Sequence, residues 1–434
     1  MKQINRGLSE KQIGYLLVLP ALLIIVVIAI WPVLRSFWIS LHDVRLNNPA
    51  KTKIHYQHGV DVEKVAEIYP VLTKNLEEAS NQADGETKAQ VGAILQQLEE
   101  MKARLDANKD FAAKYEKVDE LLFEGEPVPE DLKFASLDQK TGEEVKKQLT
   151  LVQAQLQKLT DQKQLKEDTA LGLARGLNGA LISPNFIGIN YYIQLLQNQR
   201  LWDSLNNTLV FTVISVFLEL VFGLLIALLI NRHFVGRGLV RAAVLVPWAI
   251  PTVVSALMWK FMFDGQNGIM AKFFELIGIV PDMGLLLTTK AGSMFAVIFA
   301  DVWKTTPFMA LLLLAGLQTI PSSLYEAAEV DGASKVQQFF RITLPLLKST
   351  ILVALLFRTL DAFRVFDLIY VLTGGGPANS TETISIYAYK TMFAQMNFGE
   401  GSALSVIVFI CVAIISIIFV KLLGADLVSD SRER

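Results

Sequence analysis

The sequence predicts an all-α polytopic membrane protein with six transmembrane helices. Of its 434 residues, 52% are hydrophobic and 19% are charged, and the mean hydropathy is +0.40, which is too apolar for a soluble globular chain of this length. About 20 apolar residues cross a bilayer core. Six runs reach that length, at residues 14–41, 208–230, 243–263, 291–318, 347–372 and 402–423.

The first run, GYLLVLPALLIIVVIAIWPVLRSFWISL, follows three basic residues, as the apolar part of a secretory signal does. It is too long for a signal, and no small-x-small cleavage site follows it. We therefore expect a first span that is retained.

The charge and cysteine content exclude several classes of function. The net charge is −2 and no tract is rich in Lys or Arg, so the electrostatic footprint of a nucleic-acid binder is absent. The single cysteine, Cys411, lies in an apolar run, which rules out a disulfide or a cysteine-based metal site within the chain. His55, His58 and Asp61 are close in sequence, but a solvated polar stretch is the simpler interpretation, and no metal site is predicted.

Basic residues gather on one side of the alternating topology. The opposite short loops, FDGQNGIMAKFFELIGIVPDMG and TGGGPANSTET, contain one basic residue or none. By the positive-inside rule, both termini are therefore expected in the cytoplasm. The basic residues on this side are Lys2, Arg6, Lys11, Arg232, Arg237, Arg241, Lys335, Arg341, Lys348, Lys421, Arg432 and Arg434.

Residues 43–190 form a polar segment between the first two spans, outside the cytoplasm by this topology. Apolar residues recur in it at spacings of three and four, which predicts helices with a narrow apolar seam. The turn-forming stretches GEPVPEDL and DQKTGEE favour a coiled antiparallel hairpin, with a third short helix around residues 62–76; a disordered charged spacer is the alternative. The seam residues are Ile94, Leu98, Met101, Leu105, Phe111, Tyr115, Val118 and Leu122, then Val145, Leu149, Val152, Leu156 and Leu159.

The stretch EAAEVDGASKVQQFFRITLP, residues 326–345, is rich in charge between two apolar runs. Its helix-favouring start meets Gly332, which can stop or bend a helix. The following residues place Val336, Phe339 and Phe340 on one face before Pro345 closes the segment. Two short helices that meet at a glycine would form a protruding knob, whose acidic residues can pair with a partner; an ordinary interfacial loop is the alternative.

This stretch resembles the EAA loop in the membrane subunits of ATP-binding-cassette importers. It reproduces Glu-Ala-Ala, three residues, Gly, nine residues and Ile-x-Leu-Pro without a departure. In that family the loop is a coupling helix seated in a groove of the ATPase. The resemblance implies ATPase-coupling roles for Glu326, Ala327, Ala328, Asp331, Gly332, Ile342, Leu344 and Pro345.

The chain is not expected to hydrolyse ATP itself. A phosphate-binding loop needs a glycine-rich turn before Gly-Lys-Ser/Thr, and neither LLKST at 346–350 nor VWKTT at 302–306 supplies those glycines. The sequence therefore predicts a transport subunit rather than an enzyme, with no cofactor of its own. ATP and Mg²⁺ would be bound by separate ATPase subunits.

Charged residues inside the predicted spans point to function, because each costs about 2.5 to 3.5 kcal/mol on insertion scales. In the fourth span, Asp301, Lys304, Thr305 and Phe308 share one helix face, with Trp303 beside it. We expect Asp301 and Lys304 to neutralise each other.

The fifth span carries a second charged stripe. Arg358, Asp361, Arg364 and Asp367 stand three residues apart, so neighbours of opposite sign can pair. Alternating polar and aromatic side chains suit a sugar, whereas charges that only hold helices together are the alternative. Phe363, Phe366 and Tyr370 are interleaved with the stripe. The predicted substrate pathway is Asp301, Trp303, Lys304, Thr305, Phe308, Asp361, Arg364 and Asp367.

Further stretches resemble carbohydrate-uptake permeases of the maltose/maltodextrin type, and in particular the larger partner of the permease pair. They are NFIGINYYIQLLQNQRLWDSLNNTLVFT, VLVPWAIPTVVSALMWKFMF and FRVFDLIYVLTGGGPANSTETISIYAYKTMF. The resemblance covers residues 185–424 closely and 14–42 loosely. It implies the type I importer permease fold in a bacterial cell membrane, with a second permease subunit, an ATPase homodimer and an extracytoplasmic sugar-binding protein as partners.

The resemblance gives a domain plan and leaves the sugar open. Residues 1–42 hold the N-terminus and first helix, 43–190 the helical insertion, 191–424 the five-helix core with the coupling loop at 320–345, and 425–434 a cytoplasmic tail. In the family, sugar contacts come from positions that match KTTPF and LDAFRVFD, but the residue types differ here. The predicted substrate is maltose or a malto-oligosaccharide, with trehalose, raffinose or glycerol phosphate as alternatives. As functions, a secondary transporter or a membrane scaffold is less favoured.

Overall fold

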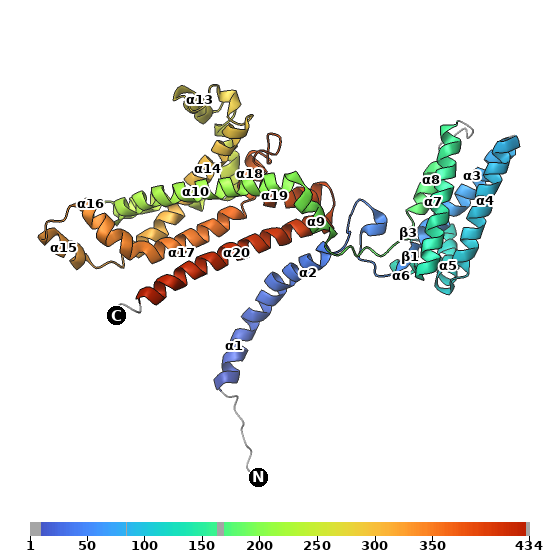
Figure 1. Cartoon of the computed structure of the whole chain (residues 1–434), viewed down its shortest axis with the longest axis horizontal. Helices are drawn as coiled ribbons and strands as arrows, with labels where there is room; N and C mark the ends of the chain where they lie inside the picture. The colour runs from blue at the N-terminus through green and yellow to red at the C-terminus, as the bar shows by residue number, and fades with distance from the viewer. Residues whose placement is uncertain (1–9, 84, 163–168, 431–434) are drawn as a thin grey trace, which may run out of the picture. The chain divides into compact units, whose positions relative to one another are not determined.

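The computed structural model describes residues 10–83, 85–162 and 169–430. The basic residues Lys2, Arg6, Arg432 and Arg434 lie outside this described part of the chain. The chain divides into two compact units (Figure 1). The membrane unit comprises Met1–Phe37, Tyr191–Ala394 and Glu400–Arg434, and the insertion unit comprises Trp38–Asn190 and Gln395–Gly399.

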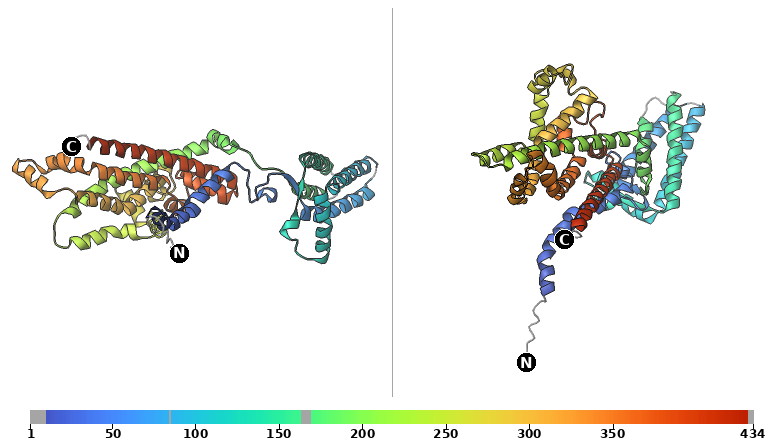
Figure 2. Two further views of the ribbon diagram at one scale, coloured as in Figure 1. Left: turned by 90° about the horizontal axis from the view of Figure 1, so that it is seen from below. Right: turned by 60° about the vertical axis from the view of Figure 1, so that its left-hand side comes forward.

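Long apolar helices dominate the membrane unit (Figures 1 and 2). Among the described residues, five helices are long and apolar enough to cross a membrane, or six if one bent pair is counted as a span. The first is α1 (Glu10–Ile25), which continues through a π-helical turn into α2 (Trp31–Ser40). The others are α10 (Gln199–Asn231), α14 (Lys290–Leu317), α17 (Leu344–Phe363) and α20 (Phe398–Asp430).

The bent pair replaces the single helix predicted at residues 243–263. α11 (Arg237–Ala249) and α12 (Thr252–Met262) meet at 88°. Pro251 has no backbone N–H and disfavours helical geometry in the residue before it, and Ile250 is extended, with ψ of 131°. The prediction of an uninterrupted helix over residues 347–372 was also wrong, because α17 ends at Phe363 and a new helix, α18, begins at Asp367.

Helix α14 forms the centre of the membrane unit and packs against α10 and α17. Small residues allow the close approach, as is usual between membrane helices. A Cβ on Gly223 of α10 would lie 2.7 Å from Met309 Cγ, and one on Gly316 would lie 2.5 Å from Thr350 Oγ1 of α17. The three helices therefore form one packed frame.

Short helices cap the two ends of this frame. α15 (Ser322–Val330) and α16 (Lys335–Gln338) lie at one end, and α9 (Asn190–Gln197) and α19 (Ile384–Tyr389) lie towards the other (Figure 1). The remaining short helices are α13 (Ile269–Leu276) and α18 (Asp367–Leu372).

The insertion unit is a helical bundle with its own apolar core. A small antiparallel sheet of order β2-β1-β3 accompanies the helices, and His58 of β1 pairs with Leu137 of β2. The helices are α3 (Val62–Gln82), α4 (Gly85–Asp106), α5 (Lys109–Glu124), α6 (Glu130–Lys133), α7 (Gln139–Asp161) and α8 (Thr169–Asn178). The strands are β1 (His58–Asp61), β2 (Phe134–Leu137) and β3 (Leu181–Ile182).

The predicted apolar seams lie in this core, but the predicted antiparallel hairpin of two helices was too simple a description of the unit. Leu98 and Leu149 are fully or almost fully buried, so a disordered spacer is wrong for the described residues. The first seam is divided where the Asn108 side chain accepts hydrogen bonds from the N–H groups of Asp110 and Phe111, capping a new helix. The expected short third helix is a full-length helix of 21 residues, and the strands were not predicted.

Candidate functional site

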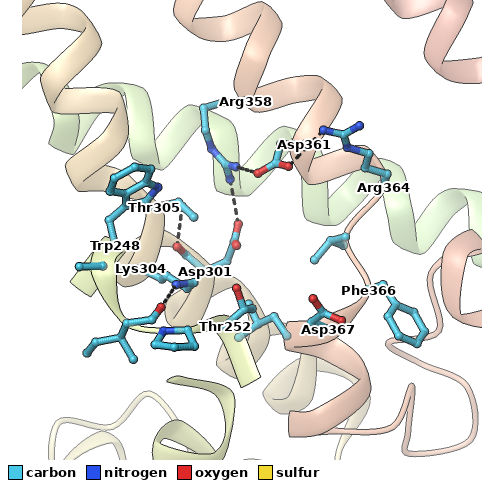
Figure 3. A pocket seen from close by; sticks show the side chains of 15 residues that line it. Trp248, Thr252, Asp301, Lys304, Thr305, Arg358, Asp361, Arg364, Phe366 and Asp367 are labelled. Atoms are coloured by element: carbon cyan, nitrogen blue, oxygen red, sulfur yellow. Dashed lines mark hydrogen bonds and ion pairs between the residues drawn. The ribbon is translucent and has the colours of Figure 1, made fainter. Parts of the chain in front are cut away.

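A charged cavity of about 540 Å³ lies in the membrane unit (Figure 3). Its walls come from the break between α11 and α12, from α14, from the end of α17 and from the start of α18. It falls within the size range of small-molecule sites. It is lined by Trp248, Ala249, Ile250, Pro251, Thr252, Asp301, Lys304, Thr305, Arg358, Asp361, Arg364, Val365, Phe366, Asp367 and Leu368.

Arg358 is the centre of the charge network. Its Nε and Nη2 donate to the two carboxylate oxygens of Glu219 on α10, at 2.5 and 2.8 Å, and both side chains are buried. Nη2 also contacts Asp301 Oδ2 at 3.3 Å, and Nη1 donates to Asp361 Oδ2 at 2.8 Å. The Thr305 hydroxyl donates to Glu219 at 2.7 Å. One guanidinium thus joins α10, α14 and α17.

Lys304 does not form the expected ion pair with Asp301. Lys304 Nζ donates to the carbonyl oxygen of Ile250 at 2.5 Å, whereas the charged partner of Asp301 is Arg358. The physical reason is the break between α11 and α12, because it leaves the Ile250 carbonyl outside a helix and in need of a donor.

The mouth of the cavity carries exposed charges. Asp361 bridges Arg358 and Arg364, the latter at 3.6 Å, and the side chains of Asp361 and Arg364 are 60% and 66% exposed. Asp367 is also exposed, and within the described part of the chain no cation lies at ion-pair distance from it. Its carboxylate oxygens can accept hydrogen bonds from a ligand.

Most of the predicted pathway residues come together here, though the two aromatic residues do not line the cavity. Asp301, Lys304, Thr305, Asp361, Arg364 and Asp367 line it. Phe308 stacks instead on Trp248, which does line the cavity, with ring centroids 5.6 Å apart and an interplanar angle of 16°. Trp303 packs edge-to-face on Trp259 in the apolar core.

Sequence reasoning missed Glu219 and Trp248. Glu219 stands in the apolar run VFLELVFGLL of the second predicted span, so the rule that drew attention to Asp301 would also have found it. Trp248 carried no such signal, because its position depends on the bend at Ile250.

The stretch 326–345 turns at a glycine as predicted, but only its first helix, α15, is short. The second helix, α16, continues through the π-helical turn Phe339–Thr343 into α17, so Pro345 does not close the segment as expected. Gly332 has φ of +77°, and the N–H groups of Gly332 and Ala333 donate to the carbonyls of Glu329 and Ala328 at 3.1 and 2.8 Å, as in a Schellman motif. Ser334 and Gln337 then form a capping box at the start of α16.

This knob presents both apolar and charged side chains. Glu329 forms an ion pair with Lys335. Glu326, Ala327, Asp331, Gly332 and Pro345 are exposed, and Ala328, Ile342 and Leu344 are half-buried. The exposed large apolar side chains are Leu324, Val330, Val336 and Phe340.

Comparison with known proteins finds a matching family model and similar permease proteins. Residues 219–428 match the model of a family described as binding-protein-dependent transport system inner membrane component. The chain is 47% identical over 236 residues to the trehalose/maltose transport system permease protein MalF of Thermococcus litoralis, covering 54% of this chain and 79% of that one. It is 47% identical over 248 residues to the trehalose transport system permease protein SugA of Mycobacterium tuberculosis, covering 56% and 78%.

One solved structure is similar as well. It is the crystal structure of a bacterial ABC transporter involved in the import of the acidic polysaccharide alginate, with a TM-score of 0.50 and 26% identity. The match covers 55% of this chain and 84% of that chain.

Proposed function

The chain belongs to the family of binding-protein-dependent transport system inner membrane components, and on this premise we propose that it is the permease subunit of an ATP-driven sugar importer. The sugar is trehalose, maltose or a related di- or oligosaccharide, since two relatives at 47% identity carry the names of trehalose and maltose systems. The chain forms half of the translocation pathway, and a second permease subunit forms the other half.

The charged cavity is the observation that carries this proposal. Its lining holds three acidic side chains, Asp301, Asp361 and Asp367, and three basic ones, Lys304, Arg358 and Arg364. A balanced set of donors and acceptors suits a neutral ligand with many hydroxyl groups better than an ion. Trp248 adds a flat apolar face for a sugar ring.

The exposed charges at the mouth would contact the sugar, and the buried ones would hold the walls. Asp361, Arg364 and Asp367 are accessible, so their oxygens and nitrogens can exchange water for sugar hydroxyls. Arg358 and Glu219 are buried and bonded to each other, so they position α17 against α10.

We propose that the coupling loop transmits movement to this cavity. It connects α14, which carries Asp301 and Lys304, to α17, which carries Arg358 and Asp361. A partner ATPase bound to the exposed face of α15 and α16 would move α14 and α17, and with them two walls of the cavity, together. Closure of an ATPase homodimer on ATP and Mg²⁺ would open the cavity outward, and hydrolysis would reset it inward.

The insertion unit has a proposed role of its own, as a docking element for an extracytoplasmic sugar-binding protein. Its separate apolar core supports a rigid element rather than a flexible linker. Deletion of residues 45–180 should lower uptake at limiting binding protein. Unchanged uptake would favour a structural spacer.

The function is tested by uptake in vesicles that contain the chain, its co-purified permease and ATPase partners, and the binding protein. Trehalose, maltose, maltodextrins, raffinose and glycerol phosphate form the substrate panel. We expect ATP-dependent uptake of one or more of the neutral sugars. Uptake driven by an ion gradient without ATP would indicate a secondary transporter and contradict the proposal.

A further inference from the structure

Four aromatic rings form a continuous series beside the charged cavity. Phe366 stacks on Tyr370, with ring centroids 5.1 Å apart and an interplanar angle of 17°. Both contact Tyr389 of α19, at 4.9 and 5.1 Å, and Tyr389 contacts Phe393 at 4.9 Å. Phe366, Tyr370, Tyr389 and Phe393 are called the aromatic series below.

The series is half open, although Phe366 at its start also packs against the apolar core of the membrane unit. Tyr370 is 40% exposed and Phe393 is 53% exposed. The series also carries two phenolic hydroxyls, and the adjacent Tyr370 raises the pKa of Tyr389 through charge repulsion and a hydrogen bond. Flat apolar faces flanked by hydroxyls suit the C–H face and the rim hydroxyls of a sugar ring.

The series is continuous with the charged cavity. Phe366 lines the cavity next to Asp367 (Figure 3), and the ring contacts lead away from it to Phe393. α18 and α19 lie towards the end of the membrane unit opposite α15 and α16 (Figure 1). A ligand ring on the series would therefore be a direct extension of a ligand in the cavity, on the side away from the coupling loop.

The backbone beneath the series is fixed by buried polar contacts. Glu382 is fully buried, and its carboxylate accepts hydrogen bonds from Arg200 Nε and Nη2 at 2.8 and 2.9 Å. It also forms an ion pair with Lys390 at 3.0 Å. Lys390 begins the π-helical turn Lys390–Ala394 that carries Phe393, and such turns are frequent at functional sites. The Asn207 amide donates to the carbonyls of Asn379 and Glu382, at 3.1 and 3.2 Å. Such support favours a preorganised platform.

We propose that the aromatic series is a second saccharide subsite, which stacks one sugar ring outside the charged cavity and makes the transporter favour saccharides longer than a disaccharide. This inference rests on the proposed function and adds a length preference to it. The charged cavity holds the leading rings through hydrogen bonds, and the series holds the following ring through its faces.

The test compares Tyr389→Leu and Phe393→Leu with the wild type in the assembled transporter, at saturating binding protein. Uptake rates are measured for maltose and maltotetraose. We expect maltotetraose uptake to fall about three- to tenfold, which corresponds to about 0.7–1.4 kcal/mol and is of the size of one aromatic contact. Maltose uptake should change less than about twofold. Phe393→Tyr keeps the ring and should transport both sugars as the wild type does.

Phe357→Leu is the matched control, because Phe357 lies on α17 and is 55% exposed, close to the value of Phe393. It should leave both rates unchanged. Co-purification of the partner subunits is measured for every variant. Loss of the second permease from the Leu variants would show that the series is a subunit interface and would overturn the subsite. A fall of the same size for maltose and maltotetraose in the Leu variants would overturn it as well.

The design separates the two proposals. If the wild type takes up no neutral sugar of the substrate panel, the proposed function fails and the subsite fails with it. If it takes up trehalose or raffinose but neither maltose nor maltotetraose, only the subsite fails. If the wild type takes up both and the ratio of the rates is the same in all variants, only the subsite fails.

Discussion

Lys304 on α14 donates a hydrogen bond from Nζ to the carbonyl oxygen of Ile250, at the point where α11 and α12 part at 88°. The bond holds a lysine at the wall of the charged cavity and satisfies a carbonyl that helix geometry has released. The bend between α11 and α12 and the position of Lys304 are therefore coupled, and a change in one should alter the other.

Lys304→Met removes this donor while keeping the length of the side chain. The carbonyl is partly buried, and the full cost of a buried carbonyl without a partner is about 1–3 kcal/mol, so the thermal midpoint of the purified protein should fall by less than that range implies and sugar uptake should decrease. Lys260→Met is the control, because Lys260 lies on α12 and is exposed; it should change neither quantity. Equal behaviour of the two variants would contradict a role for the bond.

The bond between Glu219 and Arg358 makes a stronger prediction. Removal of one partner of a buried ion pair costs about 3–5 kcal/mol because it strands a charge. Arg358→Met strands Glu219 and Asp301, so it should abolish accumulation of folded protein in the membrane, measured by size-exclusion profile and thermal midpoint.

Two further variants calibrate that result. Arg364→Met removes a guanidinium that is 66% exposed and should cost less than about 1 kcal/mol. In Glu219→Gln, Arg358 keeps the carboxylates of Asp301 and Asp361 as partners. The loss of stability in this variant should therefore lie between those of Arg358→Met and Arg364→Met. A folded Arg358→Met protein with the wild-type midpoint would refute the network.

The sequence allowed prediction of the fold class and of most of the charged cavity, for a physical reason. Apolar runs and ionised residues within them are local signals, since the bilayer imposes the same cost at any position. The helical importer-permease fold is confirmed at that level. The contacts of Lys304 and Asp301 could not be predicted. That of Lys304 depends on the bend at Ile250, and that of Asp301 depends on the approach of Arg358, which is 57 residues away from it in sequence. In the insertion unit, the seam around Leu98 was evident, whereas the pairing of His58 with Leu137 is a long-range contact with no periodic signal.

Gly332 tests the coupling loop. Its φ of +77° strains any residue with a Cβ, although no atom lies within 4 Å of the position a Cβ would take. Gly332→Ala should therefore cost about 1 kcal/mol locally and shift the C-terminal cap of α15, which should lower uptake and uncouple ATP hydrolysis from the presence of sugar.

Gly278 provides a close match for this variant. It has the same φ of +77° and the same free space, but it follows α13 and is far from the coupling loop in sequence. Gly278→Ala should carry the same backbone penalty and leave coupling intact. A similar loss of coupling in both variants would point to general destabilisation.

Glu382 predicts a dependence of stability on pH. Burial alone would raise its pKa, but the hydrogen bonds and charges of Arg200 and Lys390 outweigh it and hold the pKa of Glu382 below its ordinary value. A carboxylate whose pKa is lower in the folded state stabilises the protein above its unfolded pKa, about 4.3, and loses that contribution as the pH falls through the folded value.

Glu382→Gln should accordingly lower the thermal midpoint at pH 7, by an amount that corresponds to about 1–3 kcal/mol. The difference from the wild type should shrink as the pH is lowered below about 4, where the wild-type carboxylate takes up a proton. Glu77→Gln, at an exposed position, is the control and should follow the wild type. A difference that stays constant down to pH 3 would rule out the carboxylate as its cause.

The apolar core of the insertion unit predicts that residues 52–183 fold without the rest of the chain. Leu98, Leu149 and Leu156 are buried within this segment, so the isolated segment should be helical by circular dichroism and unfold cooperatively in urea. Leu98→Ala leaves a cavity in a packed core and should cost about 2–5 kcal/mol. Leu151→Ala, at a side chain that is 49% exposed, should cost less than about 1 kcal/mol. A gradual transition in the unmodified segment would mean that the core needs the membrane unit to form.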